Sequence, residues 1–226
     1  MGIESLTLHY DKIAAAVASG LYPPVFFNSG YCGLNIEVDE YNRGYENFCS
    51  LYVHLLDYYS VDPSGKDVLE AGCGFGRGCF FLKKRYNPTS VTGCDINSNI
   101  LDVARQLFRK TEFINGNINN LQCINRLFDI VLTIETEYYW NNNINESFAS
   151  VVKPGGDLLI ATDTRQNSSI QERLRGFILV GEKDITENIL LSLNKTPQTQ
   201  KIYKKRINKL QTTHHYISQH YKREQK

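Results

Sequence analysis

One short glycine-rich segment carries the strongest chemical signal in the sequence. It runs Glu70-Ala71-Gly72-Cys73-Gly74-Phe75-Gly76 and follows Asp67-Val68-Leu69, which reads as the start of a short buried strand. Glycines permit a tight turn and let the backbone approach a ligand closely. We therefore predict a ligand-binding turn here, with a glycine turn that holds no ligand as the alternative.

Two acidic residues favour one ligand over another. Glu70 directly precedes the glycines, whereas a dinucleotide site needs open N–H groups for its pyrophosphate. S-adenosylmethionine (SAM) has no phosphate; its amino group and its sulfonium are cationic and suit a carboxylate and loop carbonyls. Asp95 ends a second predicted strand, where an acid can take both ribose hydroxyls. We therefore expect SAM rather than NAD, with Glu70, Gly72, Cys73, Gly74, Gly76 and Asp95 in contact with it.

Further candidates follow the next two predicted strands. Asn117 could hydrogen-bond the adenine amino group, although asparagine also suits turns generally. Ile96 and Ile118 could enclose the adenine ring between them. Ile134 and Glu135 follow the fourth strand, at the carboxyl edge where open α/β sheets bind ligands.

The acceptor side of the site is predicted from the segment after Ile134. Glu135 is the first candidate for a catalytic residue near the sulfonium or the acceptor, and a structural carboxylate is the alternative. Tyr138 is the second candidate. Aromatic rings could wall an apolar pocket, although core packing is the commoner role for any one of them; these are Tyr31, Tyr138, Tyr139 and Trp140. No histidine falls at the carboxyl edge, so we name none as a base, and we expect no metal.

These residues need a scaffold of alternating strands and helices. We predict strands over 67–70, 90–95, 111–114, 129–134 and 157–162, and helices over 76–86, 98–109 and 145–152. Such alternation implies βαβ units and a parallel sheet. Further on we predict a helix over 168–175, a strand over 177–184 and a helix from about 186. Residues 214–221 fit either a last strand or a frayed helix.

The sequence resembles the class I SAM-dependent methyltransferases over about residues 61–163. The resemblance rests on Val68–Gly76, Asp95, Phe128-Asp129-Ile130-Val131 and Val152-Lys153-Pro154-Gly155-Gly156. A narrower likeness, to small-molecule methyltransferases of phthiotriol-type and phenolic lipids and of sterols and polyketides, rests on 27–31, 134–137 and 184–188. The resemblance implies an α/β fold with a Rossmann-like sheet, helices on both faces, SAM as donor, and an N-terminal helical and aromatic lid that includes Tyr31.

Three departures from the family pattern bear on these expectations. Asn117 stands where most relatives have Asp, and it can still accept and donate hydrogen bonds. Tyr138 falls near a position where the narrower group often carries His, which argues against a histidine-based mechanism. The C-terminal part is short, so we expect the family's final hairpin to be incomplete.

The resemblance suggests three parts of the chain. Residues 1–62 form a helical lid segment packed on the core, residues 63–194 form the SAM-binding core, and residues 195–226 form a helical, basic tail. The tail carries Lys201, Lys204, Lys205, Arg206 and Lys209. We interpret this stretch as an amphipathic helix with a solvated face; an RNA-contact surface is the less favoured alternative.

Composition adds limits on partners. The formal net charge is +1 over 226 residues, so no global field favours nucleic acid or an anionic membrane surface. No apolar run is long enough for a bilayer span, and we expect a cytoplasmic protein. The predicted function is SAM-dependent methylation of a small molecule, by O-methylation of an apolar or aromatic acceptor. C- or N-methylation of a small molecule or peptide, a SAM-binding partner protein without turnover, and a homodimer stay open.

Overall fold

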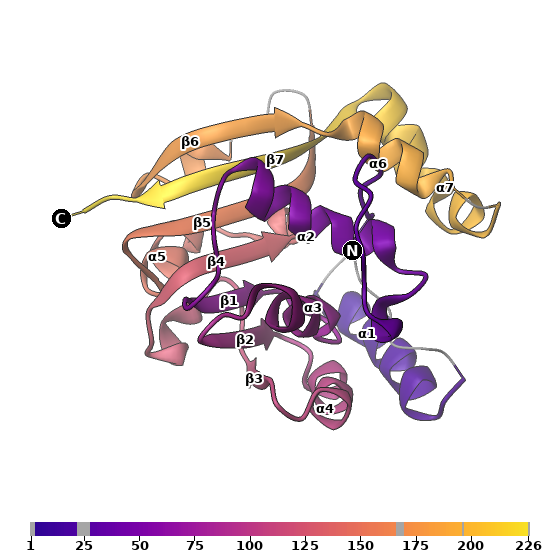
Figure 1. The fold of residues 1–226 in the computed structure, drawn as a ribbon, viewed down its shortest axis with the longest axis horizontal. Coiled ribbons are helices and arrows are strands. Elements are labelled where there is room, and N and C mark those ends of the chain that lie inside the picture. The colour runs from indigo at the N-terminus through magenta and orange to yellow at the C-terminus, as the bar shows by residue number, and fades with distance from the viewer. Residues whose placement is uncertain (1–2, 22–27, 166–169, 196, 226) are drawn as a thin grey trace.

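A seven-stranded sheet runs through the centre of the molecule (Figure 1). The computed structural model describes residues 3–21, 28–165, 170–195 and 197–225. Along the sheet the strands lie in the order β3-β2-β1-β4-β5-β7-β6. All strands run in the same direction except β7, which is antiparallel to both of its neighbours. The strands are β1 Asp67–Ala71, β2 Ser90–Asp95, β3 Glu112–Asn115, β4 Phe128–Ile134, β5 Val152–Arg165, β6 Phe177–Asp184 and β7 His214–Arg223. The predicted α/β, Rossmann-like sheet is confirmed.

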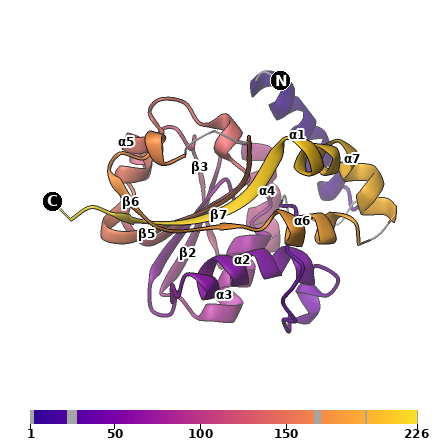
Figure 2. The ribbon, with the colours of Figure 1, turned by 90° about the horizontal axis from the view of Figure 1, so that it is seen from above.

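Helices cover both faces of this sheet. In the view of Figure 2, α2 and α3 lie on one side and α5 on the other. The α-helices are α1 Ile3–Ala18, α2 Glu46–Tyr58, α3 Arg77–Tyr86, α4 Ser98–Leu107, α5 Ile144–Ala149, α6 Thr186–Leu193 and α7 Pro197–Thr212. Short 3-10 turns are η1 Glu40–Asn42, η2 Leu121–Ile124, η3 Glu137–Tyr139 and η4 Gln171–Arg173.

The central strands β1, β2 and β4 are buried on both faces, as parallel strands usually are. Successive residues of a strand point to opposite faces. Val68 therefore joins the apolar cluster beneath α2 and α3, while Leu69 joins the cluster beneath α5. Leu159 and Leu158 of β5 divide in the same way. Two cores result, one on each side of the sheet, and they hold the carboxyl ends of the strands in place.

The N-terminal helix packs near those carboxyl ends. Ala14 and Val17 of α1 form a third apolar cluster with Ile100 and Val103 of α4 and with Phe75 of the glycine-rich turn. Because α4 and this turn directly follow β2 and β1, α1 is held beside the edge of the sheet where those strands end.

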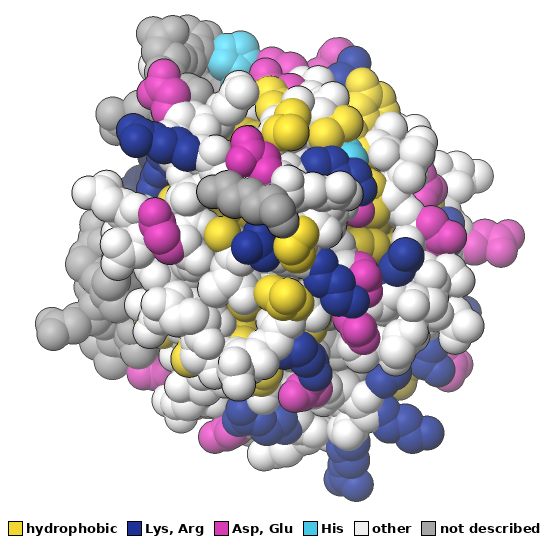
Figure 3. Space-filling view, turned by 90° about the vertical axis from the view of Figure 1, so that its left-hand side faces the viewer, with side chains coloured by type: hydrophobic (Ala, Val, Ile, Leu, Met, Phe, Trp, Pro, Cys, Tyr) yellow, Lys and Arg dark blue, Asp and Glu magenta, His cyan; other side chains and the backbone are white. Residues whose placement is uncertain are grey.

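Ion pairs lie at the opposite edge of the sheet, where the parallel strands begin. Lys153 lies 2.9 Å from a carboxylate oxygen of Asp129 and 3.8 Å from one of Asp67. In Figure 3, which views this side, Lys and Arg side chains lie interspersed with Asp and Glu. Mixed charge of this kind is typical of a solvated surface.

The C-terminal region differs from the sequence-based expectation. Residues 214–223 form a full strand, and β7 lies between β5 and β6. The final antiparallel hairpin is therefore complete, because β7 pairs over nearly its whole length with both neighbours. The predicted helix over 168–175 is reduced to η4, and its first residues lie outside the described part of the chain. None of the helices in the described ranges combines the length and apolar character that a bilayer span requires.

Candidate ligand pocket at the carboxyl edge of the sheet

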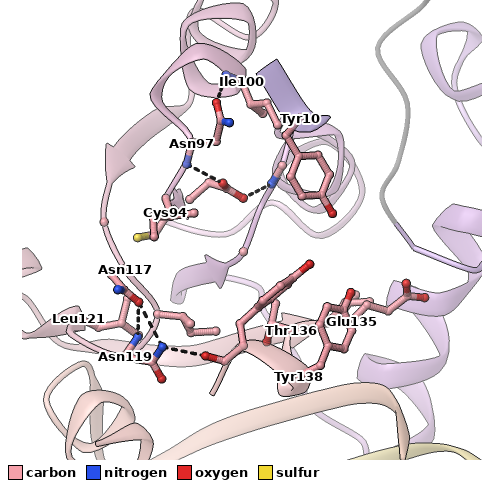
Figure 4. Close-up of a pocket in the computed structure, with 18 residues that line it drawn as sticks. Tyr10, Cys94, Asn97, Ile100, Asn117, Asn119, Leu121, Glu135, Thr136 and Tyr138 are labelled. Atoms are coloured by element: carbon pink, nitrogen blue, oxygen red, sulfur yellow. Dashed lines mark hydrogen bonds between the residues drawn. The ribbon is translucent and has the colours of Figure 1, made fainter. Parts of the chain in front are cut away.

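A pocket opens where β1, β2, β3 and β4 end. Figure 4 shows its residues, with Asn97 and Tyr10 on one side and Thr136, Glu135 and Tyr138 on the other. Its lining comes from α1, from the turns after the four strands and from the start of α4; it comprises Tyr10, Gly72, Gly74, Cys94, Asp95, Ile96, Asn97, Ile100, Gly116, Asn117, Ile118, Asn119, Leu121, Ile134, Glu135, Thr136, Tyr138 and Tyr139. Predicted residues from the ends of all four strands are therefore brought together.

Glycine is required at two positions of the first turn. Gly72 has a φ of +85°, and a Cβ atom there would lie 2.5 Å from the Cγ2 atom of Thr136. Gly76 has a φ of +73°, and its Cβ would lie 2.4 Å from the ring of Phe113. The first glycine lets Thr136 pack closely against the turn, while the second lets α3 begin against β3 without entering the pocket lining.

Asp95 sits at the centre of the pocket wall. One carboxylate oxygen accepts a hydrogen bond from the backbone N–H of Gly74 at 2.9 Å, and the other accepts from the N–H of Asn97 at 3.0 Å. Burial raises the pKa of Asp95, and the hydrogen bonds from the Asn97 and Gly74 backbone oppose that shift. A carboxylate offers about four acceptor sites. Each oxygen thus keeps capacity for one more donor, such as a hydroxyl of a bound ligand.

The turns after β2 and β3 form an apolar slot with polar edges. Ile96 and Ile118 both line the pocket, as predicted, and Ile96 is 53% exposed. The amide oxygen of Asn117 accepts from the backbone N–H of Asn119 at 2.9 Å, which is an Asx turn. Asn117 is therefore a turn residue, which was the alternative to a ligand contact. Its contact with an adenine amino group stays a prediction.

Glu135 is the anchor of a buried polar network. It adopts a φ of +58° in the turn after β4, a strained conformation for a residue other than glycine. Its Oε1 accepts from the backbone N–H of Ser29 at 2.6 Å and from the hydroxyl of Tyr216 at 2.9 Å. Its Oε2 pairs with Arg206, which also reaches Asp163 at 2.9 Å.

The network favours a structural role for Glu135. Its carboxylate already accepts from three donors, one of them a guanidinium, so both of its oxygens are engaged in holding other segments of the chain. It ties the N-terminal segment at Ser29 and the C-terminal helix at Arg206 to the end of β4. A catalytic role for Glu135, and for Tyr138 beside it, stays a prediction.

Three tyrosines narrow the pocket. Tyr10 comes from α1, and Tyr138 and Tyr139 come from η3, with the last two rings in edge contact at a centroid distance of 4.3 Å. The pocket volume is about 130 Å³, below the roughly 300–1,000 Å³ of sites that enclose drug-sized ligands. Side chains around the mouth must therefore move before a nucleoside-sized ligand is enclosed. Trp140 instead belongs to the core, where it donates to Thr136 at 3.0 Å.

Besides Trp140, four predicted residues lie outside the pocket lining. The first is Glu70, which points to the α2 and α3 face because it alternates with Leu69. There it accepts from the Tyr52 hydroxyl at 2.6 Å and the Cys79 thiol at 3.0 Å. Burial raises the pKa of Glu70 to about 7, against the opposing effect of these two hydrogen bonds. The others are Cys73, Gly76 and Tyr31.

The N-terminal lid stays a prediction, because none of the described residues 28–31 lines the pocket. Tyr31 stacks on His54 with ring centroids 4.5 Å apart, on the α2 side of the molecule and away from the pocket lining. Asn28, Ser29 and Gly30 are buried, and Ser29 reaches the pocket through Glu135. Phe27, which we also expected in the lid, lies outside the described residues. Among the described residues of the N-terminal segment, Tyr10 of α1 lines the pocket.

Sequence reasoning missed Tyr10, Asn97, Thr136 and Arg206. Asn97 caps α4 by accepting from the N–H of Ile100 at 3.0 Å, and an asparagine at a helix start is a readable signal. Tyr10 and Arg206 lie far along the chain from every strand end that forms the pocket. No local pattern marks either of them as part of the site.

Comparison with protein families finds one match. Residues 68–156 match the model described as "Methyltransferase domain". The matched segment begins within β1 and ends early in β5, so it contains the glycine-rich turn, Asp95 and the turns after β3 and β4.

Two curated relatives extend the similarity. A fatty-acid O-methyltransferase of Mycolicibacterium smegmatis is 32% identical over 66% of this chain and 56% of its own length. A phthiotriol/phenolphthiotriol dimycocerosates methyltransferase of Mycobacterium ulcerans is 30% identical over 75% of this chain and 64% of its own length. The chain thus spans less than two thirds of the length of these relatives.

A solved structure has the same fold over almost all of the chain. It is a geranyl diphosphate C-methyltransferase from Streptomyces coelicolor, in complex with Mg²⁺, geranyl diphosphate and S-adenosyl-L-homocysteine. The TM-score is 0.69 at 16% identity, covering 95% of this chain and 98% of that one. At this identity the similarity speaks for the fold, while function depends on the site.

Proposed function

We propose that this chain, whose residues 68–156 belong to the methyltransferase domain family, transfers a methyl group from SAM to a small molecule. The acceptor we propose is apolar or aromatic, and the atom methylated is an oxygen. One observation carries the proposal: the Asp95 carboxylate is fixed at the carboxyl edge of the sheet with acceptor capacity left on both oxygens.

The residues of the pocket fit SAM. In this proposal the ribose donates its two hydroxyls to the two oxygens of Asp95, and the adenine ring lies between Ile96 and Ile118, which both line the pocket. The methionine part would lie along the turn at Gly72 and Gly74, which both line the pocket. Tyr138 and Tyr139 offer aromatic faces, which attract a cation such as a sulfonium.

The chain's contribution to the chemistry is alignment and exclusion of water. Bound SAM supplies an activated methyl group on its sulfonium. Asp95 and the isoleucines fix the donor end of the pocket, and Tyr10 and Tyr138 restrict access of water to it. Glu135 holds the turn after β4 in its strained conformation through Arg206 and Tyr216. It acts as a positioning residue in this proposal.

The relatives support an oxygen acceptor on a lipid-like molecule. One of the two is described as an O-methyltransferase of fatty acids, and the other acts on phthiotriol-type lipids by its description. A cytoplasmic location is also proposed. It is supported by the free state of all six cysteines, which suits a reducing compartment. A homodimer stays a prediction, which sedimentation analysis tests.

Transfer of a labelled methyl group tests the proposal. The chain is incubated with methyl-labelled SAM and a panel of fatty acids, phenols, lipid alcohols, amines and peptides. We expect a labelled product with an ester or ether bond, and S-adenosylhomocysteine in equal amount. Label on carbon or nitrogen would show that the chain catalyses C- or N-methylation instead of O-methylation. SAM binding without turnover on any acceptor would favour a binding protein.

A further inference from the structure

A second cavity adjoins the first pocket. It is lined by Glu137, Tyr138, Asp163, Thr164, Lys205, Arg206, Lys209 and His214, and its volume is about 600 Å³, within the range of ligand sites. The two cavities share Tyr138. The ion pair of Glu135 and Arg206 also links them, because Glu135 lines the first and Arg206 the second. A molecule in the second cavity therefore lies next to the proposed donor pocket.

Both carboxylates that line the second cavity pair with arginines. Glu137 pairs with Arg173 at 2.6 Å, and Asp163 pairs at 2.9 Å with Arg206, which it shares with Glu135. Among the ion pairs of the described residues, neither carboxylate pairs with Lys205 or Lys209. Two cationic groups of the cavity thus remain open to a ligand.

The two lysines have no carboxylate partner within the described residues. They lie four residues apart on α7, so they share one face of that helix. The Nε–H of Arg206 is buried and has no acceptor in the same part of the structure. The cavity thus presents two ammonium groups that have no carboxylate partner, and the unused guanidinium donor lies buried beside it.

We infer that the second cavity binds an oxyanion group, a carboxylate or a phosphate, of the methyl acceptor through Lys205 and Lys209. This inference rests on the proposed function and narrows its substrate class to anionic acceptors. The shared wall at Tyr138 brings such an acceptor to the mouth of the donor pocket. Under this inference the basic stretch of α7 binds a ligand, whereas its sequence pattern alone predicted a solvated helix face.

The helix provides its own control. Lys201 and Lys204 are exposed on α7 and do not line the cavity. The pair Lys205→Met/Lys209→Met and the pair Lys201→Met/Lys204→Met remove the same charge from the same helix, and methionine keeps an unbranched apolar stem in place of the lysine chain. The first pair alone removes the charge from the cavity.

Octanoate, octyl phosphate and octanol serve as probes with one common alkyl chain. Their binding is measured by calorimetry at low ionic strength, with and without S-adenosylhomocysteine. We expect the unmodified chain to bind the two anions at least about tenfold more tightly than octanol, because charge-assisted hydrogen bonds are the stronger kind. We expect Lys205→Met/Lys209→Met to lose this preference and Lys201→Met/Lys204→Met to keep it. Whichever anion binds more tightly identifies the oxyanion.

Three results would overturn the inference. The first is that the unmodified chain binds the anions no more tightly than octanol. The second is that Lys205→Met/Lys209→Met keeps the anion preference. The third is that both lysine pairs lose the preference equally and a short single-stranded RNA displaces octanoate. The last would indicate a nucleic-acid surface along the whole helix. Failure of the proposed function is distinguishable, because S-adenosylhomocysteine would then fail to bind whatever the probes do.

Discussion

Arg206 of α7 forms an ion pair with Glu135 at the end of β4, and both side chains are largely buried. The same guanidinium reaches Asp163 at the end of β5. Residues 71 positions apart in the sequence are therefore joined at the edge where the two cavities meet. The pair fixes the position of α7 relative to the sheet, and with it the position of the lysines above the second cavity.

Removal of one partner of this pair should destabilise the fold. Arg206→Met leaves the carboxylate of Glu135 buried without its cation, and loss of one partner of a buried pair costs on the order of 3 kcal/mol. Urea denaturation measures the free energy of unfolding. Glu135→Gln/Arg206→Met should recover part of the loss, since no unpaired charge then remains. Equal stability of Arg206→Met and the unmodified chain would show that the pair contributes nothing.

The sequence predicted most of the sheet and the four turns after β1, β2, β3 and β4 that form the pocket. Those signals are local, because a strand, its following glycine or acidic residue and the next helix lie within a few residues of each other. The contribution of Tyr10 to the pocket and the ion pair of Arg206 with Glu135 could not be predicted, because Tyr10 and Arg206 reach the site only through packing of α1 and α7. Glu70 was predicted to contact SAM, but strand alternation turns its side chain to the face covered by α2 and α3, where it accepts from Tyr52 and Cys79.

Tyr10 should control access to the first pocket. Tyr10→Ala removes a ring from the lining, which widens the pocket and leaves a bound ligand more exposed to water. We expect S-adenosylhomocysteine to dissociate faster from this variant and its affinity to fall about tenfold, as for the loss of one aromatic contact. Stopped-flow fluorescence measures the rates. Lys12→Ala on the same helix, exposed and outside the lining, should behave as the unmodified chain.

Asp95 should carry much of the cofactor affinity. Asp95→Asn keeps the size of the side chain but removes its charge and one acceptor, which should weaken SAM binding roughly tenfold to a hundredfold. The matched change Asp102→Asn alters an exposed aspartate of α4 that pairs with Arg105, and it should have no effect. Titration calorimetry on folded protein compares the two. If Asp95→Asn binds SAM as tightly as the unmodified chain, the ribose lies elsewhere.

Glu70 should make stability fall as the pH rises. Its pKa is about 7 in the folded protein against an ordinary 4.5, so between these values the folded state holds a proton that the unfolded state has lost. Stability therefore decreases as the pH rises through this window, by up to about 3 kcal/mol. Glu70→Gln should flatten this dependence between pH 5 and 8, while Glu37→Gln, at an exposed site, should leave it unchanged. An equally steep profile in Glu70→Gln would assign the effect to another group.

Binding of the donor is the most direct test of the central claim that this pocket holds SAM. Calorimetric titration of the unmodified chain with S-adenosylmethionine, S-adenosylhomocysteine and NAD compares the three ligands under one set of conditions. We expect one molecule of either sulfur ligand to bind per chain, with competition between the two and no measurable binding of NAD. Tight binding of NAD with none of either sulfur ligand would contradict the account.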